Sequence, residues 1–201
     1  NPNLVFGRMT GFGQTGPWAK RAGHDLNYIA LAGVLGQIGP KDGPPTPPLN
    51  LVGDFGGGGM LLALGILAGL LSRGTKGHGG VVDASMVDGA AQQMTMFFGH
   101  HAAGIWQERE KGNILDGSAP FYRSYLTSDN RWVAVAAIEN KFYEQLIIVL
   151  DLQSYDLPDR NNKAHWGELS EIFARKIALL TLAQLMARAE GYDACVAPVL
   201  G

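Results

Sequence analysis

One carboxylate, Asp54, stands between a glycine run and a long segment without charge. The glycines are Gly56 to Gly59, and uncharged, mostly apolar residues then continue to Leu71. A helix that begins near Asp54 would be apolar on nearly every face, which is typical of a helix buried in a core. The sequence therefore predicts a carboxylate at the edge of the hydrophobic core, where a titratable group is suited to acid and base chemistry.

A second candidate group is His24, at the start of a predicted amphipathic helix. Apolar residues recur at helical spacing from Gly23 to Val34. Asp25 lies in the first turn, where the helix dipole favours an acid, and Tyr28 lies one turn further along the same side. A lone histidine commonly does no more than bond a neighbouring backbone group. The residues alone leave that interpretation open beside an acid or base role.

A third candidate, Glu139, follows a predicted hairpin. The segments Pro120 to Thr127 and Trp132 to Ala137 read as two strands joined by a turn at Ser128 to Asn130. A helix is predicted next, over Phe142 to Leu150. Glu139 therefore occupies a junction between strand and helix, where a helix cap is the usual explanation of such a residue.

The other elements must support these three positions. We expect short buried strands near both ends of the chain and before residue 87, and two further helices. The predicted ranges are strands within Leu4 to Gly13, Val81 to Met86 and Asp193 to Leu200, and helices at Val87 to Ala103 and Ser170 to Ala189.

Composition excludes several classes of protein. The chain has 201 residues, of which 46% are hydrophobic, so it can bury one sizeable core or a large domain with a small one. A net charge of -2 provides no basic surface for nucleic acid. The single cysteine, Cys195, excludes a disulfide framework and a Cys-rich zinc site. The adjacent His100 and His101 point in different directions on a helix, so we predict no metal site.

Two apparent motifs are rejected. Gly11, Gly13 and Gly16 match GxGxxG, but Pro17 and Trp18 follow instead of a helix, so we do not predict a dinucleotide site. The segment Phe55 to Leu71 is at the short limit of the roughly 17–25 residues that span a membrane. Because its first third is glycine, we expect a buried helix and no membrane partner. The chain opens Asn-Pro-Asn-Leu, without the features of a signal peptide, and resembles the middle of a longer protein.

Six segments in order resemble the α-methylacyl-CoA racemases, which belong to the family III CoA-transferase group. They are GRMTGFGQTGP (Gly7 to Pro17), GHDLNY (Gly23 to Tyr28), PPLNLVGDFGGGGM (Pro47 to Met60), NILDGSAPFY (Asn113 to Tyr122), AIENKFYEQL (Ala137 to Leu146) and DACVAPVL (Asp193 to Leu200). The resemblance implies an α/β fold, with part of a Rossmann-like large domain over residues 1–112 and a small α+β domain over 113–201. The charged segment Glu108 to Asn113 would link the two domains.

The resemblance also implies a chemistry, the interconversion of 2R and 2S 2-methylacyl-CoA thioesters through an enolate. His24 and Asp54 would be the two acid/base groups. Glu139 would pair with His24, and Asn50 with Asp54. Because an enolate is planar, inversion needs one proton removed from one face and another delivered to the opposite face, so two groups are required.

Four further residues are expected to contact the substrate. Asp25 and Tyr28 lie beside His24, and Gly56 and Gly57 open the glycine run. The backbone N–H groups of these two glycines would approach the thioester oxygen, where negative charge develops. The glycines would equally serve to let two elements pack closely, and the sequence does not decide between these roles. No cofactor is expected, since coenzyme A is part of the substrate.

Two rival interpretations remain. In a family III CoA-transferase, Asp54 would attack the thioester and form an acyl-aspartyl anhydride. His24 and Glu139 favour the racemase, because a transferase needs no base across from its carboxylate. The other rival is a catalytically incompetent structural fragment, since members of the family carry a further N-terminal segment and a C-terminal return.

The resemblance implies partners and a location as well. Family members are interlocked homodimers, so Glu139 would reach His24 from a different chain. We expect an acyl-CoA substrate, and a cytoplasmic location in a bacterium or a peroxisomal or mitochondrial one in a eukaryote.

Overall fold

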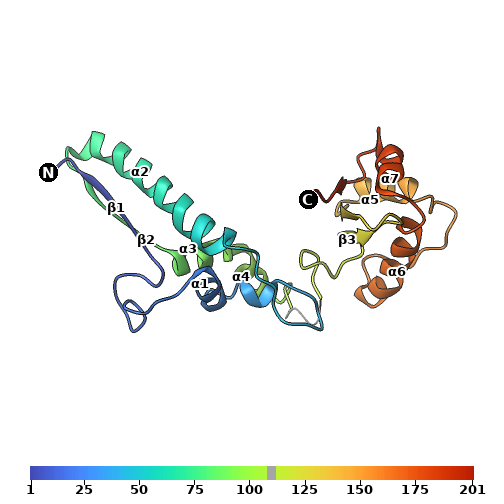
Figure 1. The fold of residues 1–201 in the computed structure, drawn as a ribbon, viewed down its shortest axis with the longest axis horizontal. Helices are drawn as coiled ribbons and strands as arrows, with labels where there is room; N and C mark the ends of the chain where they lie inside the picture. Colours follow the sequence, from blue (N-terminus) through green and yellow to red (C-terminus); the bar gives the residue numbers. More distant parts are fainter. Residues whose placement is uncertain (108–111) are drawn as a thin grey trace. The chain divides into compact units, whose positions relative to one another are not determined.

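A computed structural model describes residues 1–107 and 112–201 (Figure 1). The chain divides into two compact units, Asn1–Glu108 and Arg109–Gly201. Most of the predicted linker, residues 108–111, lies outside the described residues, and the predicted domain boundary at residue 112 stays a prediction. The mixed α/β class is confirmed, with a parallel strand pair in the first unit and an antiparallel sheet with helices in the second.

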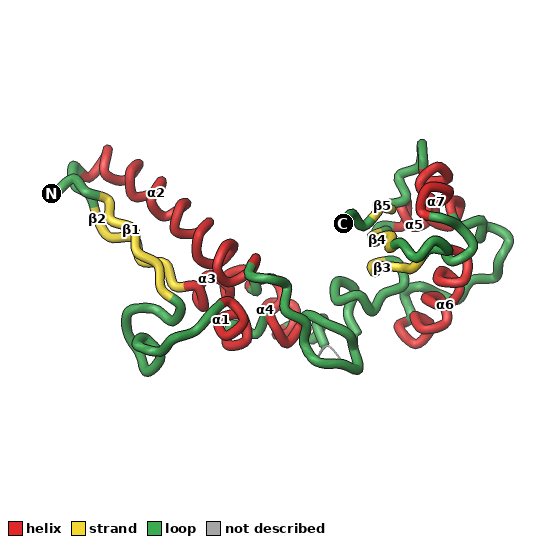
Figure 2. The backbone as a smooth tube through the Cα atoms, viewed as in Figure 1, coloured by secondary structure: helices red, strands yellow, loops and turns green. Residues whose placement is uncertain are grey.

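The first unit is built around two parallel strands, β1 (Val5–Thr10) and β2 (Gly80–Ser85). Their register pairs Val5 with Gly80 and Thr10 with Ser85. Parallel strands need a long crossover, and here it holds α1 (Asp25–Leu31), the short 3-10 helix η1 (Leu35–Gln37), the π-helix η2 (Leu51–Met60) and α2 (Leu61–Lys76). Figure 2 shows α2 running along the strand pair. Both strands were expected to be buried, but they are only partly so, with Phe6 52% and Val81 62% exposed.

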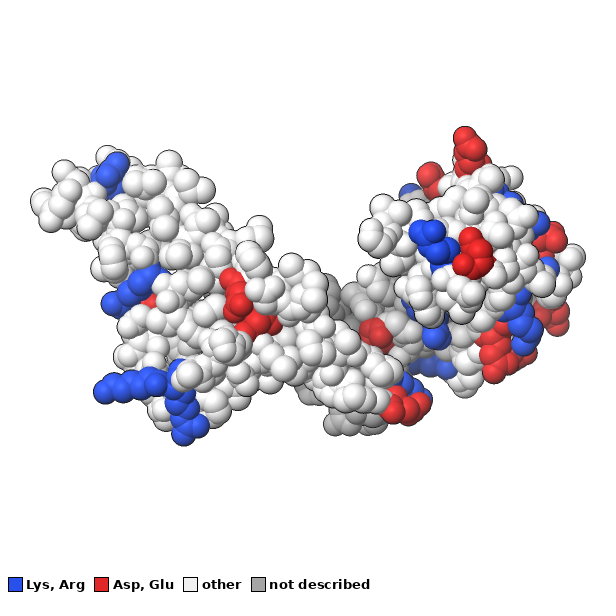
Figure 3. Space-filling view, in the orientation of Figure 1, with Lys and Arg blue, Asp and Glu red and all other residues white. Residues whose placement is uncertain are grey.

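The helix predicted to begin near Asp54 differs from its prediction in where it starts and in how far it is buried. It begins at Leu51 as a π-helix and continues as α2 to Lys76, where Gly77 ends it with a positive φ of 74°. The prediction of a buried core helix is wrong here, because α2 has no buried residue and Leu71 is 78% exposed. One face packs against β1 and β2, whereas Leu64, Leu67, Leu70 and Leu71 are exposed. The visible face of the first unit is mostly uncharged, with a few separate groups of Lys and Arg and of Asp and Glu (Figure 3).

The helix Leu51–Lys76 is also the one helix, in the part of the chain that the structure describes, that is long and apolar enough to cross a membrane. Length and composition alone support that statement. Core helices of soluble proteins meet the same criterion.

The helical segment after β2 is two helices instead of the one predicted. They are α3 (Met86–Gln93) and α4 (Thr95–Ala102), which meet at Met94. Ser85 begins α3, since its Oγ accepts the Asp88 N–H at 3.5 Å. The small core of this unit lies between α1 and α3 and contains Ile29, Ala32, Val34, Ala90 and Met94.

The second unit holds an antiparallel sheet in the order β3 (Tyr122–Leu126), β4 (Trp132–Ala136) and β5 (Val196–Pro198). The predicted hairpin and the predicted last strand are confirmed. Helices α5 (Asn140–Val149), α6 (Trp166–Ile177) and α7 (Leu182–Ala189) pack on it, and a short 3-10 helix, η4 (Lys163–His165), precedes α6. The helix predicted over residues 170–189 is instead parts of α6 and α7, because Thr181 and Gln184 form a capping box that starts a new helix. Val133, Leu146, Phe173 and Leu185 are central to the core.

Candidate active site

His24 is the residue that caps α1. Its backbone is extended (φ -134°), its N–H donates to Asn27 Oδ1 at 3.1 Å, and its carbonyl accepts the Asn27 N–H at 2.8 Å. These backbone bonds account for the start of the helix at this point. The imidazole is exposed, at the surface of the first unit.

Asp54 lies in the first turns of η2, next to its predicted partner. Asn50 Nδ2 donates to Asp54 Oδ2 at 3.3 Å, across the spacing of four residues that the sequence suggested. The N–H of Phe55 donates to the Asn50 carbonyl at 3.4 Å, in the five-residue pattern of a π-helix. The contact expected between Asn50 and Asp54 is therefore present, and it holds one oxygen of the carboxylate.

Asp25 links the helix that follows His24 to the helix that carries Asp54. It is only 4% exposed, and its Oδ2 accepts the N–H of Gly53 at 2.6 Å and that of Asp54 at 2.8 Å. Both bonds are short, as hydrogen bonds to a charged acceptor usually are. Asp25 thus joins α1 to η2 by bonds to backbone.

Tyr28 is buried beside these carboxylates. Its hydroxyl donates to the carbonyl of Gly23, and its ring packs edge to face on Phe12 with centroids 5.0 Å apart. Burial raises the pKa of Tyr28, and the nearby charges of Asp54 and Asp25 raise it further. The hydroxyl therefore stays protonated at neutral pH. Tyr28 is held by protein groups at the same corner as the two carboxylates.

The two glycines expected to contact the substrate pack against other elements. A Cβ at Gly57 would lie 2.7 Å from the backbone N of Ala90, and one at Gly56 would lie 2.8 Å from Gln93 Oε1. Close contact with α3 thus accounts for glycine at both positions. A π-helix also directs its amides to carbonyls five residues earlier. The role of Gly56 and Gly57 toward the thioester oxygen stays a prediction.

Glu139 lies in the second unit, as the residue that caps α5. Its carbonyl accepts the N–H of Phe142 at 3.1 Å and that of Tyr143 at 2.9 Å, but its side chain makes no capping hydrogen bond. Helix capping therefore explains the backbone hydrogen bonds of Glu139, but it does not explain why the residue is a glutamate. Pairing of its exposed carboxylate with His24 stays a prediction.

Sequence reasoning missed Arg160, which supports the backbone just before Glu139. Its guanidinium donates to the carbonyls of Ala137 and Ile138. No motif pointed to Arg160, because the contact joins residues 22 and 23 apart in the chain. Gly53 was missed for the same reason, since its partner Asp25 is 28 residues away.

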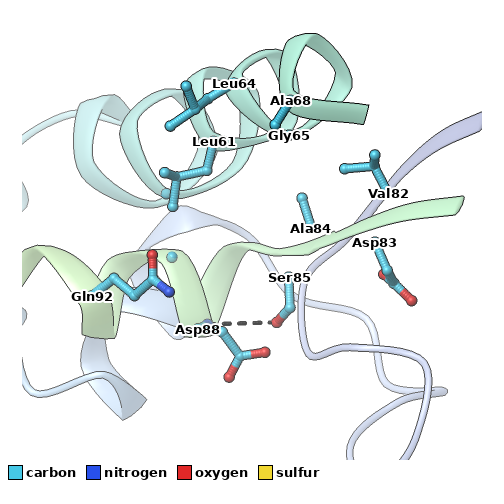
Figure 4. A pocket seen from close by; sticks show the side chains of 12 residues that line it. Leu61, Leu64, Gly65, Ala68, Val82, Asp83, Ala84, Ser85, Asp88 and Gln92 are labelled. Carbon is cyan, nitrogen blue, oxygen red and sulfur yellow. Dashed lines mark hydrogen bonds between the residues drawn. The ribbon is translucent and has the colours of Figure 1, made fainter. Parts of the chain in front are cut away.

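A cavity of about 310 Å³ lies elsewhere in the first unit, between α2, β2 and α3 (Figure 4). Its walls are mostly apolar, and its polar side is formed by Asp83, Ser85, Asp88 and Gln92. Of the expected site residues only Gly57 lines it. Among the described residues, no three His, Cys, Asp or Glu side chains gather as a metal site.

Comparison with known proteins shows one family along the whole chain. The model of CoA-transferase family III matches residues 1–201. The chain is 46% identical to the α-methylacyl-CoA racemase of Mus musculus and 44% identical to that of Homo sapiens, in each case over 200 residues and 100% of this chain. It covers 52% of each, so it spans about half the length of the curated relatives it matches. A crystal structure of a CAIB/BAIF family protein from Brucella suis has the same fold, with a TM-score of 0.77 at 23% identity, over 100% of this chain and 54% of that one.

Proposed function

The chain belongs to CoA-transferase family III, and from this membership we propose that the whole protein is an α-methylacyl-CoA racemase. Racemase relatives that are 44–46% identical over the full chain support the proposal. The observation that carries it is the bond of 2.8 Å from the Asp54 N–H to Asp25. This bond links the helix that carries Asp54 to Asp25, the residue next to His24. Asp54 and His24 are the two acid/base candidates.

In the proposed reaction, one group removes the α-proton of a 2-methylacyl-CoA thioester and leaves a planar enolate. The other group then delivers a proton to the opposite face, so one C–H bond breaks and one forms. We assign His24 to the 2S epimer and Asp54 to the 2R epimer. Asn50 orients the carboxylate of Asp54, and Glu139 is assigned the same task toward His24.

The substrate and assembly follow from the same membership. The acyl-CoA thioester brings coenzyme A with it, so no separate cofactor is needed. We propose an interlocked homodimer in which Glu139 of one chain serves His24 of another. Asp25, Tyr28, Gly56 and Gly57 remain proposed contacts to the substrate. A bacterial protein would act in the cytoplasm, and a eukaryotic one in peroxisomes or mitochondria.

A CoA-transferase is the second candidate, because the family as a whole carries that name. Asp54 would then attack the thioester, release coenzyme A and hold the acyl group as an anhydride. His24 argues against this reaction, since acyl transfer through Asp54 has no step for a base on the opposite face. No comparison favours a purely structural role for the chain.

Proton exchange tests the proposal. The full-length protein is incubated in deuterated water with each epimer of a 2-methylacyl-CoA, and deuterium at the α-carbon is followed by mass spectrometry. We expect exchange together with epimerisation, and no acyl transfer to an added free acid. Asp54→Asn should abolish epimerisation, whereas Asp83→Asn, which only breaks an ion pair with Arg8 in the same unit, should leave it unchanged. Acyl transfer without exchange would contradict the proposal and favour the transferase.

A further inference from the structure

Among the described residues, no ion pair accounts for the burial of the Asp25 carboxylate. It is instead bonded to backbone, through the N–H groups of Gly53 and Asp54 at 2.6 and 2.8 Å, and both bonds end on Oδ2. A buried carboxylate is costly unless its charge is met by donors. These two N–H groups supply that stabilisation.

The two donors belong to the first turn of η2. The first N–H groups of a helix have no partner within the helix, and a negative charge near them is favourable. Asn50, which precedes η2, provides no side-chain cap to the backbone, and its Nδ2 donates to the Asp54 carboxylate. Asp25 therefore acts as the cap of η2, supplied from the start of α1.

This contact requires glycine at position 53. A Cβ at Gly53 would lie 2.7 Å from Asp25 Oδ2 and 3.3 Å from the Cα of Asp25. Real Cβ atoms essentially never approach another atom to less than 3.0 Å. Only glycine at position 53 lets the two segments come this close.

We propose that Asp25 is a positioning residue, which fixes the backbone of Asp54 and thereby sets the location of its carboxylate relative to His24. The inference rests on the proposed racemase function and deepens it. Asp25 follows His24 directly in the chain, so its side chain links the backbone next to His24 to the backbone of Asp54. Its task toward Asp54 uses Oδ2 and is separate from the substrate contact expected of Asp25. The other carboxylate oxygen, Oδ1, is buried and has no hydrogen-bond partner among the described residues.

Exchange measured separately from each epimer distinguishes these tasks. Asp25→Ala in the full-length protein removes both bonds to the η2 backbone, so Asp54 shifts while His24 keeps its own backbone bonds. Exchange of the epimer that Asp54 deprotonates should fall about 10- to 100-fold, as expected for loss of hydrogen bonds to a charged group. Exchange of the other epimer should fall less than about threefold. Epimerisation should fall equally from both sides, because the equilibrium between the epimers is unchanged. The variants His24→Asn and Asp54→Asn show which epimer each group serves.

Two more variants keep the test valid if Asp25→Ala folds poorly. Asp25→Asn retains an oxygen that accepts the N–H groups but loses the charge, so we expect the same asymmetry at about three- to tenfold. Gly53→Ala disturbs the contact from the other side without touching Asp25, and it should reproduce the asymmetry. Gly74→Ala is the matched control, since an added Cβ there meets nothing within 4 Å, and both exchange rates should stay unchanged.

The outcomes separate this inference from the proposed function. Absence of exchange in the unmodified protein refutes the racemase itself. Normal exchange in the unmodified protein, with an equal fall for both epimers in the Asp25 and Gly53 variants, overturns the positioning role. A raised KM with kcat preserved also overturns it, because that pattern indicates a substrate contact through Asp25.

Discussion

Arg160 packs against two aromatic rings near the end of strand β4. Its guanidinium lies 4.6 Å from the ring centroid of Phe121 and 4.3 Å from that of Tyr143. From this position it donates to the carbonyls of Ala137 and Ile138, the two residues before Glu139. Burial lowers the pKa of Arg160, which is the expected direction for a desolvated cation. The geometry makes Arg160 a support for the segment that presents Glu139.

We predict that Arg160→Met weakens this segment. Methionine fills much of the same space but provides no donor, so the two carbonyls lose their partner. The opening free energy of the backbone around residues 132–149 should fall by about 2 kcal/mol, which hydrogen exchange followed by mass spectrometry measures peptide by peptide. Arg175→Met is the control, since its ion pair with Glu171 is exposed and 3.6 Å long. Equal protection in both variants would show that Arg160 contributes nothing to the support.

Single residues show where sequence reasoning succeeded and where it stopped. The contact of Asn50 with Asp54 was expected from the family resemblance, and a spacing of four residues on a helix is compatible with it. The bond from Gly53 to Asp25 was not expected, because it depends on how two helices cross. The side chain of Glu139 was equally ambiguous, since a helix cap and an orienting carboxylate occur at the same kind of junction.

Helices η2 and α3 cross so closely that their backbones touch. A Cβ at Gly89 would lie 2.0 Å from the carbonyl oxygen of Gly57. We predict that Gly89→Ala forces the helices apart and lowers the free energy of unfolding of the first unit by about 3 kcal/mol, measured by urea denaturation. Gly99→Ala in α4, where an added Cβ meets nothing within 4 Å, should not destabilise the protein. An unchanged midpoint for Gly89→Ala would mean that the crossing relaxes without cost.

Elements were predicted better than their ends and their burial. Two segments rich in strand-forming residues, joined by the turn at Ser128 to Asn130, were sufficient to predict the hairpin. The break between α6 and α7 was missed because the apolar spacing runs on through Thr181, whose capping role is visible only with Gln184. The split at Met94 has no Gly or Pro to mark it. The π-helical start at Leu51 also leaves no pattern in the sequence.

On the scale of the whole molecule, the order of the motifs along the chain identified the family, which the periodicity of apolar residues could not do. Six segments in sequence identified the family before any geometry was known, and the match over residues 1–201 confirms it. Burial could not be predicted in this way. An apolar sequence pattern is typical of a core helix, but the burial of the helix depends on what packs against each face. In the described part of the first unit, α2 packs mainly against β1, β2 and η2.

The outward leucines of α2 lead to the last prediction. Leu64, Leu67 and Leu71 are 61%, 60% and 78% exposed on the same helix. Contiguous apolar surface of this kind promotes association in water. The 201-residue chain alone should therefore self-associate at micromolar concentration, measured by light scattering after gel filtration, and replacing Leu64 and Leu71 with Gln should reduce it. Leu179→Gln removes a leucine that is 74% exposed in the second unit, and it should leave association unchanged. If both changes act alike, general apolar exposure drives association, and the face of α2 has no special part in it.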